Sequence, residues 1–99
     1  MKAVRFHDAA RLELRHEVSY YWTVSPVLGC RLLEAVEEAV TLARSFPEIG
    51  APYLQQTKRV LPKRFPFSIV YVETPSEIYV VAFAPVRRKP GYWQARTKE

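Results

Sequence analysis

The sequence predicts an α+β fold in which a strand, two helices and three more strands follow one another in a single domain, residues 1–99. Two stretches near the N-terminus repeat apolar residues at helical spacing, and Ser25-Pro26 separates them. Three runs rich in β-branched and aromatic residues follow after residue 55. We therefore expect an antiparallel sheet with an α-helical hairpin packed on one face, and the other face left uncovered.

The first strand and helix are expected over residues 2–7 and from Asp8 to about Val24. Polar and apolar residues alternate over 2–7, so alternate side chains face opposite sides of a short edge strand. Asp8 has the side chain of a helix N-cap. One apolar stripe follows at helical spacing: Ala10, Leu14, Val18 and Tyr21.

The second helix is expected to begin at Ser25-Pro26 and to stop at Pro47. Serine caps a helix, and proline suits its first position because the missing N–H would be unpaired there. Gly29 lets the two helices approach closely, and the short connection makes them antiparallel. The expected apolar face holds Leu32, Leu33, Val36, Ala39, Val40, Ala43 and Phe46.

The second half reads as a loop, three strands and a tail. Residues 47–55 are rich in proline and glycine, which favours a loop. Strands are expected near 56–62, 65–73 and 78–84, and the last is apolar on both faces, as a central strand is. The basic tail, about residues 86–99, has no periodicity.

Composition and charge limit the classes of function. No run approaches the ~20 apolar residues of a membrane span, and the charged N-terminus lacks a signal core, so we expect a cytoplasmic protein. The single cysteine, the two separated histidines and the three glycines predict no metal, no cofactor and no small-molecule site. Residues 1–50 carry a net charge of −1 and residues 51–99 carry +6, which favours an anionic macromolecular partner, nucleic acid or acidic protein, over a merely solvated surface.

Several local patterns follow one another over about residues 4–96. They are Phe6 to Ala10 opening a helix that ends in Tyr20-Tyr21-Trp22, Leu28-Gly29 and Ser45-Phe46-Pro47 in the second helix, the strand Arg64-Phe65-Pro66-Phe67-Ser68-Ile69-Val70-Tyr71, and Ala82-Phe83-Ala84 leading to Arg87-Arg88-Lys89-Pro90-Gly91-Tyr92-Trp93. With these patterns in this order, the chain resembles the RelE/ParE toxins of type II toxin–antitoxin systems, some of which serve in plasmid stabilisation.

The resemblance implies the β-α-α-β-β-β fold, a partner and two possible targets. Toxins of this family are held inactive by a co-expressed antitoxin, so we expect a hetero-oligomer with an acidic, partly apolar antitoxin segment. ParE-like members inhibit DNA gyrase. RelE-like members cut messenger RNA on the ribosome. A non-toxic relative that only binds its partner is a third possibility.

The residues favour gyrase docking over RNA cleavage, so we lean away from an enzyme. An endoribonuclease of this family would use Arg59 and Arg88 for phosphate stabilisation and Tyr92 as acid or base. Two other cation positions are lost, to Leu61 and Ser68.

The residues that we expect to bind the target or the antitoxin are Lys58, Arg59, Lys63, Arg64, Arg87, Arg88, Tyr92 and Trp93. The plainer interpretation of the strand cations is an exposed strand edge kept soluble by charge. The plainer interpretation of Tyr92 and Trp93 is an aromatic pair folded back on the domain, and we favour it slightly.

Overall fold

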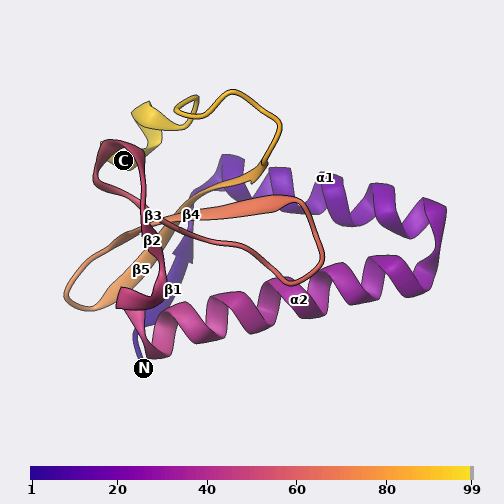
Figure 1. Cartoon of the computed structure of the whole chain (residues 1–99), viewed down its shortest axis with the longest axis horizontal. Helices are drawn as coiled ribbons and strands as arrows, with labels where there is room; N and C mark the ends of the chain where they lie inside the picture. Colours follow the sequence, from indigo (N-terminus) through magenta and orange to yellow (C-terminus); the bar gives the residue numbers. More distant parts are fainter. Residues whose placement is uncertain (99) are drawn as a thin grey trace.

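The computed structural model describes residues 1–98, and it forms two layers, a helical hairpin on a five-stranded sheet. Figure 1 shows the two helices lying side by side and extending beyond the sheet. The elements are β1 (Ala3–Phe6), α1 (Asp8–Val24), α2 (Pro26–Ser45), β2 (Ala51–Pro52), β3 (Lys58–Val60), β4 (Phe67–Glu73) and β5 (Glu77–Pro85), with short 3-10 turns η1 (Pro47–Ile49), η2 (Leu54–Gln56) and η3 (Gln94–Lys98).

The sheet is mixed, in the order β1-β5-β4-β3-β2. The three expected C-terminal strands do form an antiparallel meander, but β1 pairs with β5 in parallel, which corrects the expectation of an entirely antiparallel sheet. A tight turn forces neighbouring strands to be antiparallel, and no such turn joins β1 to β5. The fifth strand, β2, lies inside the segment 47–55 that was expected to be loop.

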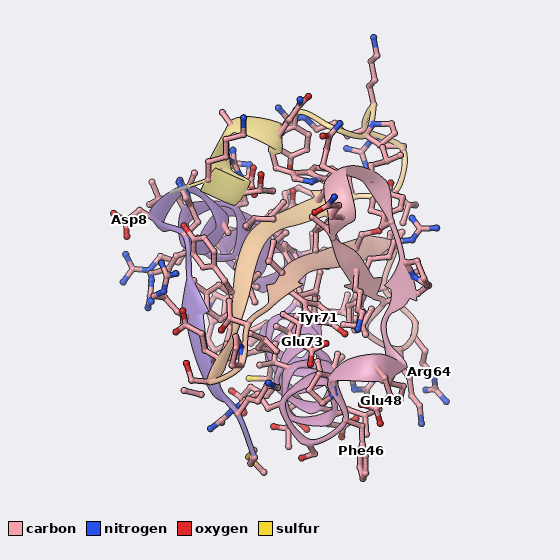
Figure 2. The ribbon with its side chains drawn as sticks, turned by 90° about the vertical axis from the view of Figure 1, so that its left-hand side faces the viewer. Asp8, Phe46, Glu48, Arg64, Tyr71 and Glu73 are labelled. Atoms are coloured by element: carbon pink, nitrogen blue, oxygen red, sulfur yellow. The ribbon has the colours of Figure 1, made fainter. Side chains whose placement is uncertain are left out.

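The sequence predicted the N-cap residue of α2 correctly and that of α1 incorrectly. His7, and not Asp8, caps α1: its Nδ1 accepts a hydrogen bond from the Ala9 N–H at 3.0 Å, while Asp8 lies exposed in the first turn (Figure 2). Ser25 caps α2 as expected, by accepting from the Leu28 N–H at 3.5 Å.

Gly29 lies where the two helices approach each other, as expected. A Cβ on this residue would lie 2.9 Å from Cε3 of Trp22. The hairpin therefore depends on the missing side chain at this position.

The main core lies between the hairpin and the inner face of the sheet. Leu32, Val36 and Ala43 of α2 are buried there, and the whole expected stripe of α1 packs against the same cluster. Two residues of the expected α2 face are exposed instead: Leu33 is 41% exposed and Phe46 is 54% exposed. The apolar arc of α2 is thus wider than the surface that α1 and the sheet cover.

The outer face of the sheet is not bare, which corrects the expectation of an open face. Here "outer face" means the side away from the helices, which presents Val70, Tyr79, Val81, Ala82 and Ala84. All five are buried, together with Trp93 from the tail, which is 1% exposed. The tail, coloured yellow at its end, lies across the sheet from α2 (Figure 1).

A bulge in β5 widens the apolar part of the outer face. Val70 pairs with Ala82 and Tyr71 pairs with Val80, so Val81 is an extra residue in β5. Val81 and Ala82 consequently both contribute to the outer face.

No helix within residues 1–98 is long and apolar enough to cross a membrane.

Candidate functional site

A continuous stack of arginines and aromatic rings crosses the outer face. The guanidinium carbon of Arg59 lies 4.4 Å from the ring centroid of Tyr53, and Tyr53 stacks on Trp93 at 5.6 Å. Trp93 meets Tyr92 edge to face at 5.3 Å, and the guanidinium carbon of Arg88 lies 3.6 Å from the Tyr92 ring centroid. Each arginine–ring contact is a cation–π interaction, so the stack stabilises the tail over the sheet.

Glu13 of α1 anchors the tail at the other end of this stack. Its Oε1 accepts hydrogen bonds from the Phe83 N–H at 3.1 Å and from Nη1 of Arg96 at 3.0 Å. Arg96 also donates to the Val81 carbonyl at 3.1 Å, and Arg88 lies 4.0 Å from the second carboxylate oxygen. Helix, strand and tail therefore meet at a single carboxylate.

Tyr92 has the wrong acidity for proton transfer near neutral pH. Burial, followed by the nearby charge of Glu13, raises the pKa of Tyr92 to about 12. An efficient general acid or base has a pKa close to the working pH. The Tyr92 hydroxyl and Nε1 of Trp93 are both buried and lack a well-formed hydrogen bond within residues 1–98.

The three residues expected to catalyse RNA cleavage do not converge. Arg88 and Tyr92 are in contact, but Arg59 lies at the far end of the stack, beyond Trp93 and Tyr53. Arg59 also donates a hydrogen bond to Oγ of Ser68 at 3.3 Å. Ser68 is the residue that stands where a cation was expected. Arg59 and Arg88 are therefore separated by the rings of the stack and do not meet at one phosphate position.

The expected docking cations fall into two groups. Lys58 forms an ion pair with Glu73 at 2.9 Å, and this hydrogen bond raises the pKa of Lys58. Lys63, Arg64 and Arg87 are exposed, and none makes an ion pair with another described residue. These three remain available to an external anion, while Trp93 would reach a partner only if the tail moved.

A groove of about 910 Å³ lies between α2 and the chain from Ile49 to Lys63, and the sequence did not predict it. We call it the α2 groove. Its apolar residues include Leu42, Phe46, Ile49 and Leu61, all between 45% and 54% exposed. Phe46 points away from the body of the protein at the end of α2 (Figure 2). The signal in the sequence was the unusually wide apolar arc of α2.

Tyr71 fixes the far wall of the α2 groove. Its hydroxyl donates to the Pro47 carbonyl at 2.7 Å, and Gly50 lies so close that an added Cβ would be 2.8 Å from Cζ of Tyr71. Tyr71 is fully buried beneath this loop (Figure 2). The wall that carries Ile49 and Ala51 is therefore held in place by the core.

No family model and no curated protein matches this chain. Among the solved structures, one match is to a chain of the chromosomal ParDE toxin–antitoxin system from P. aeruginosa. The two chains share 18% sequence identity and superpose with a TM-score of 0.73 over 86% of this chain and 96% of the other. At this identity the likeness concerns the fold. The chain therefore has the fold of the RelE/ParE toxins.

Proposed function

We propose that this protein is the toxin of a type II toxin–antitoxin system, that it acts in the cytoplasm by docking on DNA gyrase, and that a co-expressed antitoxin neutralises it. Two observations support this proposal. The fold is similar to that in a solved ParDE toxin–antitoxin system. Lys63, Arg64 and Arg87 also present positive charge that no described residue pairs with, which suits an anionic macromolecule.

The arginine–aromatic stack is the observation that favours docking over RNA cleavage. In this stack Arg59 lies over Tyr53 and Arg88 lies over Tyr92, so these residues help to hold the tail. The stack also keeps the two arginines apart. Cleavage of a phosphodiester needs several cations around one phosphate and a proton donor or acceptor of suitable pKa. Neither requirement is met by this arrangement of the three residues.

One observation keeps a ribonuclease as the second candidate. Arg88 and His16 line the same shallow hollow beside α1, together with Glu13 and Glu17. Histidine is the side chain whose ordinary pKa suits acid–base catalysis near neutral pH. In that case His16, and not Tyr92, would transfer the proton, and Arg88 would stabilise the phosphate.

The test is to express the chain alone from an inducible promoter, and then with the neighbouring reading frame. We expect growth arrest that the neighbour's product relieves, inhibition of gyrase supercoiling by the purified chain, and intact messenger RNA. Codon-spaced cuts in the RNA, with normal gyrase activity, would instead select the ribonuclease. Growth unaffected by high expression would favour the non-toxic relative.

Arg88→Ala separates the two targets. The side chain of Arg88 is 54% exposed, so its loss should remove the contact with Tyr92 but leave the domain folded. A docking toxin that uses many contacts should keep most of its activity, whereas a ribonuclease should lose its growth arrest. Circular dichroism of the variant confirms that it is folded.

A further inference from the structure

We propose that the end of the helical hairpin, residues 18–30, docks into an apolar pocket with an acidic rim on the protein that the toxin inhibits. We call residues 18–30 the hairpin tip. The identity of the inhibited protein as gyrase rests on the proposed function, but the chemistry of the pocket follows from the side chains of the hairpin tip and its neighbours.

The hairpin tip is the longest stretch of the chain without a charged side chain. Residues 18–30 contain no Asp, Glu, Lys, Arg or His. The next longest uncharged runs include residues 78–86, which are mostly buried because they form strand β5. The hairpin tip instead lies at the end of two helices that extend beyond the sheet (Figure 1). Burial in the core therefore does not explain why this stretch lacks charge.

Four large side chains of the hairpin tip are more than half exposed. Their exposed fractions lie between 51% and 59%, and they are Tyr20, Trp22, Val24 and Val27. They come from the last two turns of α1 and the first turn of α2, so they share one end of the molecule. Tyrosine and tryptophan carry much of the binding energy in protein interfaces, and the centres of interfaces are depleted of charge. The hairpin tip has the composition of such a centre.

Contacts within the chain hold the rings of the hairpin tip in place. The Ser25 N–H donates to the Tyr21 carbonyl at 2.9 Å, and Tyr20 meets Tyr21 edge to face at 5.6 Å. The Trp22 ring lies against Gly29, where an added Cβ would be 2.9 Å from Cε3 of the ring. Aromatic side chains that are already ordered lose little conformational entropy on binding. The hairpin tip is therefore prepared to bind without rearrangement.

A positively charged loop flanks the hairpin tip. The Tyr21 ring packs edge to face against Phe65 at 5.6 Å, so the loop of residues 61–66 reaches the hairpin. The two residues before Phe65, Lys63 and Arg64, are exposed, and neither makes an ion pair with another described residue. Acidic side chains around the partner's pocket would complement these two cations.

The same charges disfavour nucleic acid and a second copy of this chain as the occupant. Glu17 and Arg31 border the hairpin tip with opposite charges, so Lys63 and Arg64 leave its flank positive. Nucleic acid requires cations within the contact to pair with phosphates, and residues 18–30 hold none. A two-fold pairing of hairpin tips would bring two positive flanks together. A pocket on a different protein has neither disadvantage.

Supercoiling by the gyrase holoenzyme, with the full-length chain as inhibitor, tests the inference. The double variant V24S/V27S removes two exposed aliphatic side chains, and we expect it to inhibit roughly tenfold less well than the parent. The matched control is Leu12→Ser, since Leu12 is 62% exposed on α1 about three turns before Val24, and it should inhibit as the parent does. Urea unfolding of each variant shows that the fold is kept.

Cys30 reports the contact directly, because it is exposed and is the single cysteine of the chain. Its alkylation by iodoacetamide, followed by mass spectrometry of the peptide that contains it, should slow several times when gyrase is added in excess. At the same concentrations V24S/V27S should be alkylated at the rate of the free chain. Unchanged alkylation of Cys30 in a parent chain bound to gyrase would overturn the inference.

Lys63→Glu tests the acidic rim. At low salt we expect this variant to bind gyrase roughly tenfold more weakly, and about 1 M salt should remove most of the difference. The matched control is Lys89→Glu, which makes the same change in net charge at an exposed residue of the tail and should have little effect. Equal weakening by the two variants would show that net charge, and not a rim facing the hairpin tip, attracts the partner.

Growth assays keep this inference separate from the proposed function. A V24S/V27S variant that inhibits gyrase as well as the parent would refute the hairpin tip and leave the toxin proposal standing. A parent chain that arrests growth without inhibiting gyrase, combined with loss of arrest in V24S/V27S, would refute gyrase as the target and support the hairpin tip. A chain with neither effect overturns both proposals. Binding to a single-stranded oligonucleotide, to an anionic vesicle or to a second copy of the chain that V24S/V27S abolishes would overturn the proposed occupant.

Discussion

The sequence predicts that the outer face of the sheet is open and that the apolar face of α2 is covered. In the structure the outer face is covered, and part of the apolar face of α2 is open at the α2 groove. The outer face belongs to strands with no second layer of helices, yet the chain's own tail buries it with Trp93 at 1% exposure. The α2 groove lies beside the most regular amphipathic helix, yet Leu42 and Phe46 are exposed there. The difference teaches that the open surface of this small domain depends on where an irregular segment folds back.

The two surfaces also differ in how their charges are used. On the outer face, Arg59 and Arg88 cover aromatic rings and Arg96 pairs with Glu13, so these cations stabilise the fold, although Arg59 also lines the α2 groove. In the α2 groove, Glu34 and Glu38 face solvent without a partner among the described residues. Charges satisfied within the chain stabilise it, and unsatisfied ones are available for recognition.

The largest expected difference between the surfaces is in stability. Trp93→Ala removes a buried ring that stacks on Tyr53, and we expect it to lower the free energy of unfolding by about 3–5 kcal/mol. Leu42→Ala, in the groove, should change it by less than about 1 kcal/mol because the side chain is 45% exposed. Urea unfolding followed by circular dichroism measures both values.

A domain of this size is stable by only about 5–15 kcal/mol, so the Trp93 variant should come close to unfolding at 37 °C. Similar losses of unfolding free energy in Trp93→Ala and Leu42→Ala would contradict the distinction between a buried outer face and an open α2 groove. A stable Trp93→Ala variant would mean that the tail leaves the sheet in solution, and the open face expected from the sequence would be restored.

The sequence predicted the regular elements well because their signals are local. The caps and spacing of α2 and the apolar run of β5 depend on residues a few positions apart, and both elements form as expected. The place of Trp93 could not be predicted in this way. Its tail has no periodicity, and its contacts are with Tyr53 and with strand residues distant in the sequence.

The candidate site was predicted less well, for a related reason. Arginine and tyrosine in a basic tail suit both RNA binding and internal stacking, and only the fold decides between them. Arg88 and Tyr92 were expected together and do lie in contact, but the partner of Arg59 is Tyr53. The α2 groove was missed because Phe46 continues the apolar stripe of a helix that ends one residue earlier.

A smaller effect is expected from loosening the anchor of the tail. Glu13→Gln removes the charge that pairs with Arg96, whose side chain is only 18% exposed, and should cost about 2 kcal/mol. The released tail should be cut by trypsin after Arg88 and Arg96 several times faster than in the parent chain.

Glu17→Gln is the matched control for the anchor, since Glu17 is one turn further along α1 and makes no ion pair with a described residue. Equal rates of tail cleavage in the two variants would show that Glu13 does not hold the tail.

The smallest expected effect is that of Tyr92→Phe. The Tyr92 hydroxyl is buried without a well-formed hydrogen bond, so its loss should change stability at pH 7 by less than about 0.5 kcal/mol. Because the folded pKa of Tyr92 is raised to about 12, folding stability should fall as the pH rises from 10 to 12, and this fall should be absent in the variant. Ultraviolet titration of tyrosinate formation and urea unfolding at each pH measure both effects.

Tyr92→Phe also tests whether the buried outer face takes part in a reaction. The variant keeps the ring beneath Arg88 and its edge contact with Trp93, so the stack and the fold should persist. If the outer face serves only to hold the tail, growth arrest should be unchanged. If instead Tyr92 transfers a proton during RNA cleavage, removal of its hydroxyl should reduce cleavage by about 10²–10⁴-fold in a protein that is still folded, and the outer face would then be an active site.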